Sequence, residues 1–467
     1  MNALYRLTAA ALCAALLLCL LGCGPEEPAS PPSVDTTPTL SDEELYDQAR
    51  AKLLASPNQV LIYTLTETRT VGQQDYTESV TGTASMGGIG TDGMEAMAKE
   101  TLTYGTLRAE HTLTYCGGSA YSQISGHTFT QSMSPADFVA KQLPAALLDR
   151  VLYKTVEVKT TIDGTFFTFA DASQLETWVS GGSDAQFTNA SGTATLDTNG
   201  LLVASTYTAT YTRGAATYRL EVDIKSSTPA TLDLSAIHPE HYENAIPLAC
   251  LEAPGLLMRA VGDIFTARDL ACTISETIYS QAIPLIRKRQ TTATVSGSGQ
   301  NMTATLDSAI QATVYQGQPT LSSQNYRFEG GVCTSTVNGG GPSIQTGVTA
   351  ESMRTGIEDA ILSGLFATRY LADAELTETE DLYILRFRGN DAYCNDLSGD
   401  IGAFLKMDLD GLSTSYETTE AAGYLSIHKQ TVLPTAMGIS FARTHAFGEI
   451  SNQLTYQLDQ SLQLSPE

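Results

Sequence analysis

The chain has 467 residues, 42% of them hydrophobic, which is enough to bury the cores of about two domains. Acidic residues outnumber basic ones by 51 to 26, and a formal net charge of −25 disfavours binding to nucleic acid or to anionic lipid head groups. The sequence contains no motif typical of a metalloprotease, a nucleotide-binding protein or a serine hydrolase, so we expect neither an enzyme nor a bound cofactor.

The first 23 residues predict export and lipidation. An apolar stretch follows Arg6 and ends in Leu20-Leu21-Gly22-Cys23. This ending resembles a bacterial lipobox, in which the cysteine is acylated, for example with palmitate, and becomes the new N-terminus. The resemblance implies a signal peptide over residues 1–22 and a lipoprotein held by Cys23 on the extracytoplasmic face of the cell membrane. An ordinary secretory signal and an uncleaved membrane helix are the two alternatives.

Residues 23–40 predict a tether between the membrane and the folded body. The segment is rich in Pro, Ser, Thr and acidic residues, a composition that buries little surface and stays extended. Two or more acyl chains on the cysteine are sufficient for stable membrane anchoring.

The body shows signs of an internal duplication. A capping box at Ser41 starts the first helix of one half, and an apolar stripe from Leu257 marks its counterpart. A second helix is predicted after Ser134 in the first half and after Thr349 in the second. Four pairs of landmarks, offset by 211 to 217 residues, occur in the same order: Leu45 and Leu257, Cys116 and Cys333, Leu147 and Ile361, Gly200 and Gly411.

Strands are expected between and after these helices. Residues 60–70 and 270–280 alternate apolar and polar side chains, and later segments are rich in Thr, Tyr and Val, as in half-buried antiparallel sheets. We therefore predict an α+β fold of two tandem antiparallel-sheet domains, with helices packed on one face of each sheet. The domains are expected at residues 41–235 and 255–467, joined by a linker at 236–254.

This order of helix, long antiparallel strands, helix and further hairpins, behind a lipobox, resembles the half-barrels of LolA-like and LppX-like envelope proteins. In that family a curved sheet wraps helices and leaves an apolar cavity for acyl chains. The resemblance implies binding of an apolar or amphipathic ligand such as an envelope lipid, but it identifies no ligand-binding residue. The alternatives are a solidly packed core, and an envelope protein that binds another protein through acidic sheet surfaces or edge strands.

Five cysteines remain after the lipidated one: Cys116, Cys250, Cys272, Cys333 and Cys394. An extracytoplasmic location permits disulfides, and the odd number leaves at least one thiol without a partner in the chain. Spacing alone does not fix the connectivity. Our preferred pairs are Cys250–Cys272 across the domain junction and Cys333–Cys394 within the second half.

Four weak local patterns predict structure rather than chemistry. A Ser-x-x-Lys pattern lies in a strand-like alternation, which places its two side chains on opposite faces. Two histidines near the junction lack a convincing third metal ligand, and an Asp-x-Asp-Gly segment predicts a hairpin rather than a calcium loop. A lone histidine in a strand-like run is expected to pack or to face solvent. The residues are, in that order, Ser426 and Lys429, His238 and His241, Asp408 to Gly411, and His111.

Overall fold

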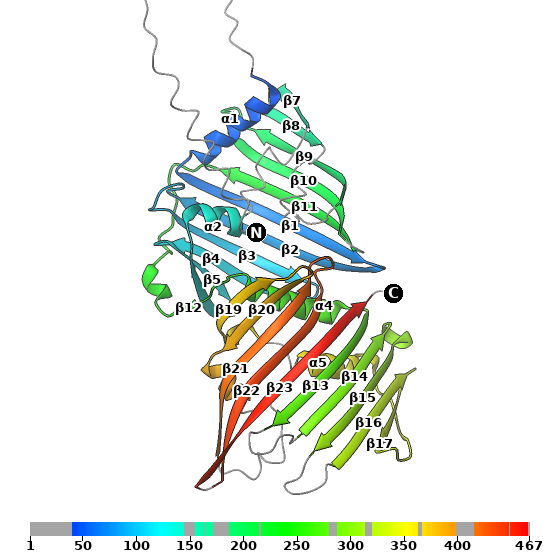
Figure 1. Ribbon diagram of the computed structural model, residues 1–467. Helices are drawn as coiled ribbons and strands as arrows, with labels where there is room; N and C mark the ends of the chain where they lie inside the picture. Colours follow the sequence, from blue (N-terminus) through cyan, green and yellow to red (C-terminus); the bar gives the residue numbers. More distant parts are fainter. Residues whose placement is uncertain are drawn as a thin grey trace, which may run out of the picture.

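The computed structural model describes residues 40–143, 155–162, 164–170, 186–213, 216–279, 287–312, 320–362, 367–397, 415–447 and 449–465. Two units follow one another along the chain, and each is built on one large, mainly antiparallel sheet (Figure 1). Cys23, Leu147 and the Asp408–Gly411 segment lie outside the described residues, so the predictions made for them stay predictions.

Within the described residues, the first unit contains two helices and eleven strands of a 12-stranded sheet. Its elements are α1 (Asp42–Leu54), β1 (Asn58–Val71), β2 (Gln74–Gly87), β3 (Glu95–Tyr104), β4 (Leu107–Cys116), β5 (Ser119–Ile124), β6 (His127–Ser132), α2 (Pro135–Gln142), β7 (Thr155–Thr161), β8 (Gly164–Ala170), β9 (Gln186–Leu196), β10 (Leu202–Arg213) and β11 (Ala216–Ser227).

A short junction and the second unit follow. The elements are η3 (Pro239–Tyr242), β12 (Ile246–Pro247), α4 (Ala253–Thr266), β13 (Asp269–Tyr279), β14 (Arg287–Ser296), η4 (Gly299–Asn301), β15 (Thr303–Ala312), β16 (Thr320–Glu329), β17 (Val332–Val337), β18 (Ser343–Thr346), α5 (Ala350–Leu362), η5 (Thr368–Tyr370), β19 (Leu371–Glu378), β20 (Leu382–Gly389), α6 (Asp391–Leu397), β21 (Ser415–His428), β22 (Pro434–Phe447) and β23 (Ile450–Ser465).

The two sheets have the same strand order. The first is β6-β5-β4-β3-β2-β1-β11-β10-β9-β8-β7, with β12 added in parallel beside β6. The second is β18-β17-β16-β15-β14-β13-β23-β22-β21-β20-β19, which is the first order with 12 added to every strand number. This agreement confirms the predicted fold of two tandem antiparallel-sheet domains and gives the predicted duplication a structural basis.

A Gly-Gly turn aligns the two repeats residue by residue. Gly117-Gly118 joins β4 to β5 and Gly330-Gly331 joins β16 to β17, and all four glycines have φ between 56° and 77°. Two-residue hairpin turns of this kind require positive φ at both positions. Ser122 is therefore equivalent to Ser335, and Cys116 is equivalent to Glu329. The predicted pairing of Cys116 with Cys333 is wrong, because the two cysteines lie on opposite sides of the turn.

Helix caps form where the sequence predicts them. The Ser41 side chain accepts from the Glu44 amide at 3.2 Å, and the Glu44 carboxylate accepts from the Ser41 amide at 2.8 Å, which closes the capping box of α1. Ser134 accepts from the Asp137 amide at 3.1 Å, with Pro135 as the first residue of α2. Thr349 accepts from the Ser352 amide at 3.1 Å at the start of α5.

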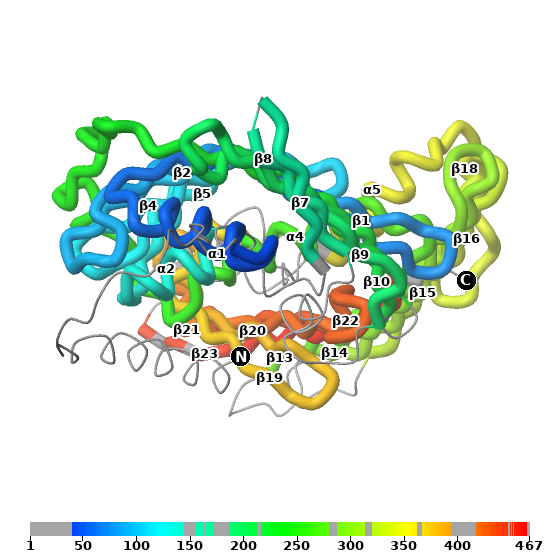
Figure 2. Tube along the Cα trace, turned by 90° about the horizontal axis from the view of Figure 1, so that it is seen from above, coloured from blue at the N-terminus to red at the C-terminus, as the bar shows by residue number. Residues whose placement is uncertain are grey.

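The core of the first unit lies between α1 and the sheet. Seen from above, α1 lies within the curve of the strands (Figure 2). Tyr46 of α1 packs edge-on against Phe167 and Phe169 of β8, with ring centroids 5.2 and 5.1 Å away. The strands keep the alternation that the sequence predicts, and every second residue of β11 is buried.

The predicted disulfides are wrong. Cys250 and Cys272 are buried thiols outside any disulfide, and the Cys250 thiol donates to a Glu252 carboxylate oxygen at 2.9 Å. Cys333 is also an unbonded, buried thiol, on β17 near one edge of the second sheet. Cys394 lies in α6, which packs on β20 and β21 toward the opposite edge. Seven strands separate β17 from β20, so spacing along the chain was a poor guide to proximity.

The junction between the units is structured. Residues 236–254, predicted to be a linker, include η3 and β12, and β12 extends the first sheet. His238 directly precedes η3 and His241 lies within it, and the His238 imidazole lies 3.3 Å from Glu240. Within the described ranges, no helix is both long and apolar enough to cross a membrane.

Candidate functional site

A pocket of about 420 Å³ lies between the inner face of the first sheet and helices α2 and α4. Strands β1 to β5 form its floor, and the end of α2 with the first turns of α4 forms its opposite wall. Aliphatic side chains line much of it: Leu65, Val80, Leu102, Leu113, Ile124, Leu143, Leu251, Pro254 and Leu256. A concave site of this size with apolar walls and a few polar groups is typical of small-molecule binding.

A row of polar side chains crosses the floor of the pocket. The Tyr63 hydroxyl donates to Glu100 Oε1 at 2.5 Å, and Glu100 Oε2 lies 2.8 Å from His111 Nδ1. His111 Nε2 lies 2.7 Å from Ser122 Oγ. These residues come from four strands, β1, β3, β4 and β5, and all of them line the pocket. The row places a continuous hydrogen-bonded chain on the floor of a pocket whose walls are largely aliphatic.

The strand register explains this row. Glu100 is directly opposite His111 across the β3–β4 hairpin, and Gly82 of β2 lies between Tyr63 and Glu100. A Cβ atom at Gly82 would lie 2.7 Å from Cζ of the Tyr63 ring. The missing side chain therefore lets the ring pass over β2 and reach a carboxylate two strands away.

The side chains of the polar row are largely buried, and their hydrogen bonds fix where the protons lie. The Glu100 side chain is 7% exposed, the His111 side chain 13%, and Ser122 as a residue 2%. A carboxylate can only accept hydrogen bonds, so the Nδ1 proton of His111 points at Glu100. Nε2 of a neutral imidazole then accepts the hydroxyl proton of Ser122. Burial, together with the Glu100 charge, raises the pKa of Tyr63 well above its usual value, so its hydroxyl remains a donor.

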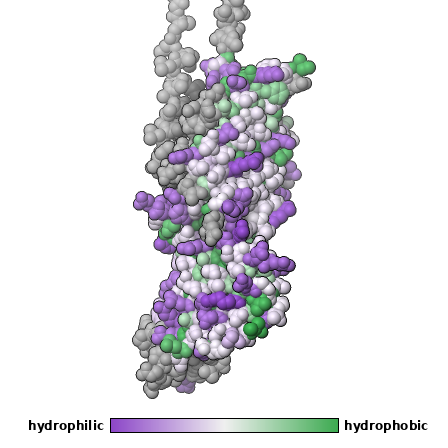
Figure 3. All heavy atoms as spheres, turned by 90° about the vertical axis from the view of Figure 1, so that its right-hand side faces the viewer, coloured by the Kyte–Doolittle hydropathy of each residue, from purple (hydrophilic) through white to green (hydrophobic). Residues whose placement is uncertain are grey.

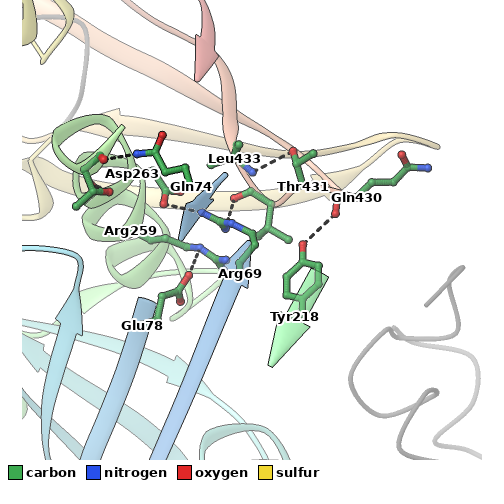
Figure 4. Close-up of polar contacts among 12 residues, drawn as sticks. Arg69, Gln74, Glu78, Tyr218, Arg259, Asp263, Gln430, Thr431 and Leu433 are labelled. Atoms are coloured by element: carbon green, nitrogen blue, oxygen red, sulfur yellow. Dashed lines mark hydrogen bonds and ion pairs between the residues drawn. The ribbon is translucent and has the colours of Figure 1, made fainter. Parts of the chain in front are cut away.

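A second polar cluster joins the pocket to the second unit (Figure 4). Arg259 of α4 lines the pocket and pairs with Glu78 of β2 at 2.6 Å. One turn along α4, Asp263 accepts from Arg69 of β1 at 2.7 Å, and Arg69 also donates to the Val432 carbonyl at 3.1 Å. Helix α4 thus links the pocket wall to the β21–β22 connection.

Two further contacts hold the units together beside this cluster. The Tyr218 hydroxyl of β11 donates to the Gln430 carbonyl at 2.9 Å. The Gln74 side chain donates to the Thr266 carbonyl and accepts from the Arg268 amide at 2.9 Å. The Gln74 contacts reach residues 266–268, between α4 and β13, and the Tyr218 contact reaches the β21–β22 turn.

Burial dominates the protonation of Glu78. Burial raises the pKa of Glu78 to about 7, although the charge of Arg259 acts in the opposite direction. Tyr104, the neighbour of Glu78 across β2 and β3, has its pKa raised to about 12, mainly by burial. The end of the pocket at α4 therefore holds a carboxyl group that titrates near neutral pH.

The second unit differs at the equivalent positions. The row Tyr63, Gly82, Glu100, His111 and Ile124 corresponds to Ile274, Thr291, Ser308, Gln324 and Val337. There Thr291 donates to Ser308 at 3.1 Å, and the polar groups of the adjacent row include Glu276, which pairs with Arg289 at 2.5 Å. The histidine–carboxylate pair is therefore a property of the first repeat.

Among the sequence-based candidates, His111 lines this pocket, whereas Ser426, Lys429, His238 and His241 lie outside it. Ser426 lies in β21 and Lys429 follows its end, where it pairs with Glu378 at 3.0 Å. Across the described segments, no group of three or more His, Cys, Asp or Glu residues has a metal-binding arrangement. His111 was expected to pack or to face solvent. The signal that could have found its role is the equal spacing of 11 residues from Glu100 to His111 and from His111 to Ser122.

The outer surface shows no dominant apolar region on the side drawn in Figure 3. Hydrophilic residues are spread over both units there, and hydrophobic residues form small separate patches. The apolar lining of the pocket lies instead between the first sheet and helices α2 and α4.

No family model and no curated protein matches the chain. The solved structures with partial similarity include LprF from Mycobacterium bovis, with 13% identity and a TM-score of 0.26 over 41% of this chain and 95% of that one. Rv2717c from M. tuberculosis has 12% identity and a TM-score of 0.16, over 44% and 97% of the two chains. A DUF1329 family protein from Desulfovibrio piger has 12% identity and a TM-score of 0.17, over 42% and 98%. These similarities are too distant to support a function.

Proposed function

We propose that the protein is a membrane-anchored extracytoplasmic lipoprotein that binds one amphipathic ligand in the pocket of its first unit. The observation that supports this proposal is the pocket itself, which lies between sheet and helices and combines aliphatic walls with a polar row. An alkyl or acyl chain fits beside Val80, Leu102 and Leu256, and a polar group fits near His111 and Ser122. The net charge of −25 disfavours recognition of a strongly anionic head group.

Ligand binding can be tested by narrowing the pocket. The full-length protein is incubated with dansylaminoundecanoic acid, and native mass spectrometry counts the bound molecules. Val80→Trp places an indole among the lining residues, and we expect binding to weaken by about tenfold or more, since the indole occupies part of the space that the ligand needs. The neighbouring residue Thr81 is exposed on the other face of β2, so Thr81→Trp is a matched control that should bind normally. Equal binding by wild type and Val80→Trp would contradict the proposal.

The anchor is tested separately. In Cys23→Ala the acyl mass should be lost, and the protein should move to the soluble fraction or remain as an unprocessed precursor. Cys19→Ala changes a cysteine of the same apolar stretch that is not the lipobox cysteine, so it should be lipidated normally. Normal maturation and membrane association of Cys23→Ala would rule out the lipobox interpretation.

One observation favours the alternative function, binding of another envelope protein. Strand β18 is an edge of the second sheet, all four of its residues are exposed, and Ile344 is 66% exposed. Exposed edge strands can pair with a strand of a partner protein. Val80→Trp should leave such an interaction intact, whereas Ile344→Lys should weaken it in cross-linking on intact cells.

A further inference from the structure

We propose that Ser122, His111 and Glu100 form a nucleophile, a general base and an orienting carboxylate that hydrolyse an ester bond of a ligand bound in the pocket. The proposal rests on the pocket admitting an amphipathic ligand, as proposed above, and adds a chemical reaction to it. The substrate class is a carboxylic ester with an alkyl or acyl chain.

The geometry meets the requirements of an activated serine. Ser122 Oγ lies 2.7 Å from His111 Nε2, and His111 Nδ1 lies 2.8 Å from Glu100 Oε2. Both distances are within hydrogen-bond reach, and the carboxylate fixes the imidazole in the tautomer whose Nε2 can take the hydroxyl proton. Tyr63 holds the other oxygen of Glu100 at 2.5 Å. Tyr63 is therefore a positioning residue, since it acts through Glu100.

The same three residue types recur in serine hydrolases on unrelated folds, so the arrangement is recognised by geometry rather than by position in the chain. All three side chains line one pocket with largely aliphatic walls, so an ester bound in the pocket would lie beside the serine. The Glu100 carboxylate and the Ser122 hydroxyl lie on opposite ring nitrogens of His111, which is the arrangement that an oriented general base requires.

The reaction balances with water as the second reactant. Ser122 Oγ forms a bond to the carbonyl carbon while its proton passes to His111 Nε2, and the carbonyl π electrons move to oxygen. When they return, the bond from carbon to the alkoxy oxygen breaks, and the departing alkoxide takes the proton from Nε2. A water molecule then gives a proton to Nε2 and attacks the acyl carbon, and Ser122 Oγ leaves and regains that proton. The net change is ester plus water to carboxylic acid plus alcohol.

Stabilisation of the oxyanion must come from side chains. Ser122 lies in the middle of β5 and is paired on both sides, with Leu113 of β4 and with Phe129 of β6, so its backbone groups belong to the sheet. Gln142, at the end of α2, lines the same pocket and carries side-chain N–H donors. Side-chain amides serve as oxyanion donors in other acyl-transfer enzymes.

The test is covalent labelling of the full-length protein in isolated membranes with a fluorophosphonate probe. We expect a phosphonyl adduct that peptide mass spectrometry places on Ser122. Labelling should fall by about 100-fold or more in His111→Gln and in Glu100→Gln, because the serine loses its base or the base loses its orientation. The same variants should lower kcat/KM for p-nitrophenyl butyrate, and Ser122→Ala should abolish turnover.

The second repeat supplies an internal control. Ser335 is equivalent to Ser122, but Gln324 and Ser308 stand where His111 and Glu100 stand in the first repeat. Ser335 should therefore remain unlabelled in the same sample. Equal labelling of both serines would show non-specific reactivity and would overturn the proposal.

Binding of dansylaminoundecanoic acid separates the two proposals. If the wild type binds this fatty acid but Ser122 is not labelled, the row is a structural hydrogen-bond chain and only the catalytic proposal fails. If neither binding nor labelling occurs, the pocket does not admit such ligands and both proposals fail. Ser122→Ala that still binds the fatty acid shows that loss of labelling is not loss of folding.

Discussion

Burial controls the reactivity of the cysteine thiols. Burial raises the pKa of Cys272 to about 11, and burial with the neighbouring Glu252 charge raises the pKa of Cys250 to about 12. Since only the thiolate reacts, alkylation at pH 8 should be slower by about 100-fold or more than in the unfolded chain. Iodoacetamide labelling without reductant, before and after adding guanidinium chloride, measures this. A Cys250–Cys272 disulfide would instead leave both residues unmodified in denaturant.

Glu78 should make stability depend on pH. Its folded-state pKa of about 7 lies above the ordinary value, so the native state binds the proton more tightly than the unfolded state does. The stabilising contribution is complete below about pH 4.5 and is lost as the pH rises to about 7, by about 3 kcal/mol in total. In Glu78→Gln this decrease should be absent from urea-unfolding free energies measured from pH 4 to 8. Glu110→Gln, at an exposed position on β4, should leave the decrease intact.

The polar row shows why single residues are hard to assign from sequence. His111 has Glu100 and Ser122 at 11 residues on either side. That spacing becomes meaningful only when the turns of two successive hairpins fix the register of β3, β4 and β5. The cysteine pairs failed for a related reason, because closeness along the chain does not measure distance across an 11-stranded sheet.

Elements are where sequence-based prediction succeeded. The capping box at Ser41 and the helix starts after Ser134 and Thr349 depend on contacts within four residues, and the structure confirms all three. The alternation of apolar and polar side chains predicted β1 and β13 correctly, because that pattern too is local. The extra strand β12 was not predicted, since two residues are too short to show a period.

A side chain at Gly82 should displace the Tyr63 ring that lies over β2. In Gly82→Ala the added methyl group would clash with the Tyr63 ring, so we expect a loss of about 1–3 kcal/mol in unfolding free energy. Gly356→Ala is a matched control in the exposed part of α5, where a Cβ meets no other atom within 4 Å. That variant should gain about 0.5–1 kcal/mol, since alanine favours a helix. Equal effects in urea unfolding would mean that Tyr63 is not held over β2.

At the scale of the whole molecule, Arg69 holds the two units together. Its side chain is 1% exposed, and it contacts Asp263 of α4 and the Val432 carbonyl of the β21–β22 turn. In Arg69→Met the Asp263 charge remains buried without this partner, so we expect a loss of about 3–5 kcal/mol and separate unfolding of the two units. Urea unfolding measures both effects.

A double variant checks the cause of that loss. In Arg69→Met with Asp263→Leu no charge is left without its partner, and part of the stability should return. The single and double variants should unfold alike if the ion pair contributes nothing at the junction. The sequence could not reveal this contact, because Arg69 and Val432 are 363 residues apart.

The strand order has a consequence for the export proposed above. In each repeat the strand that comes first in the chain pairs with the strand that comes last, β1 with β11 and β13 with β23. Both strands lie in the middle of the sheet, so the last strand joins its two halves. A chain that crosses a membrane from its N-terminus delivers β23 after every other strand of the second unit. Until β23 arrives, β13–β18 and β19–β22 are two separate ribbons with unpaired edges at β13 and β22. During this interval the unpaired edges of the incomplete sheet are most accessible to proteases and to chaperones.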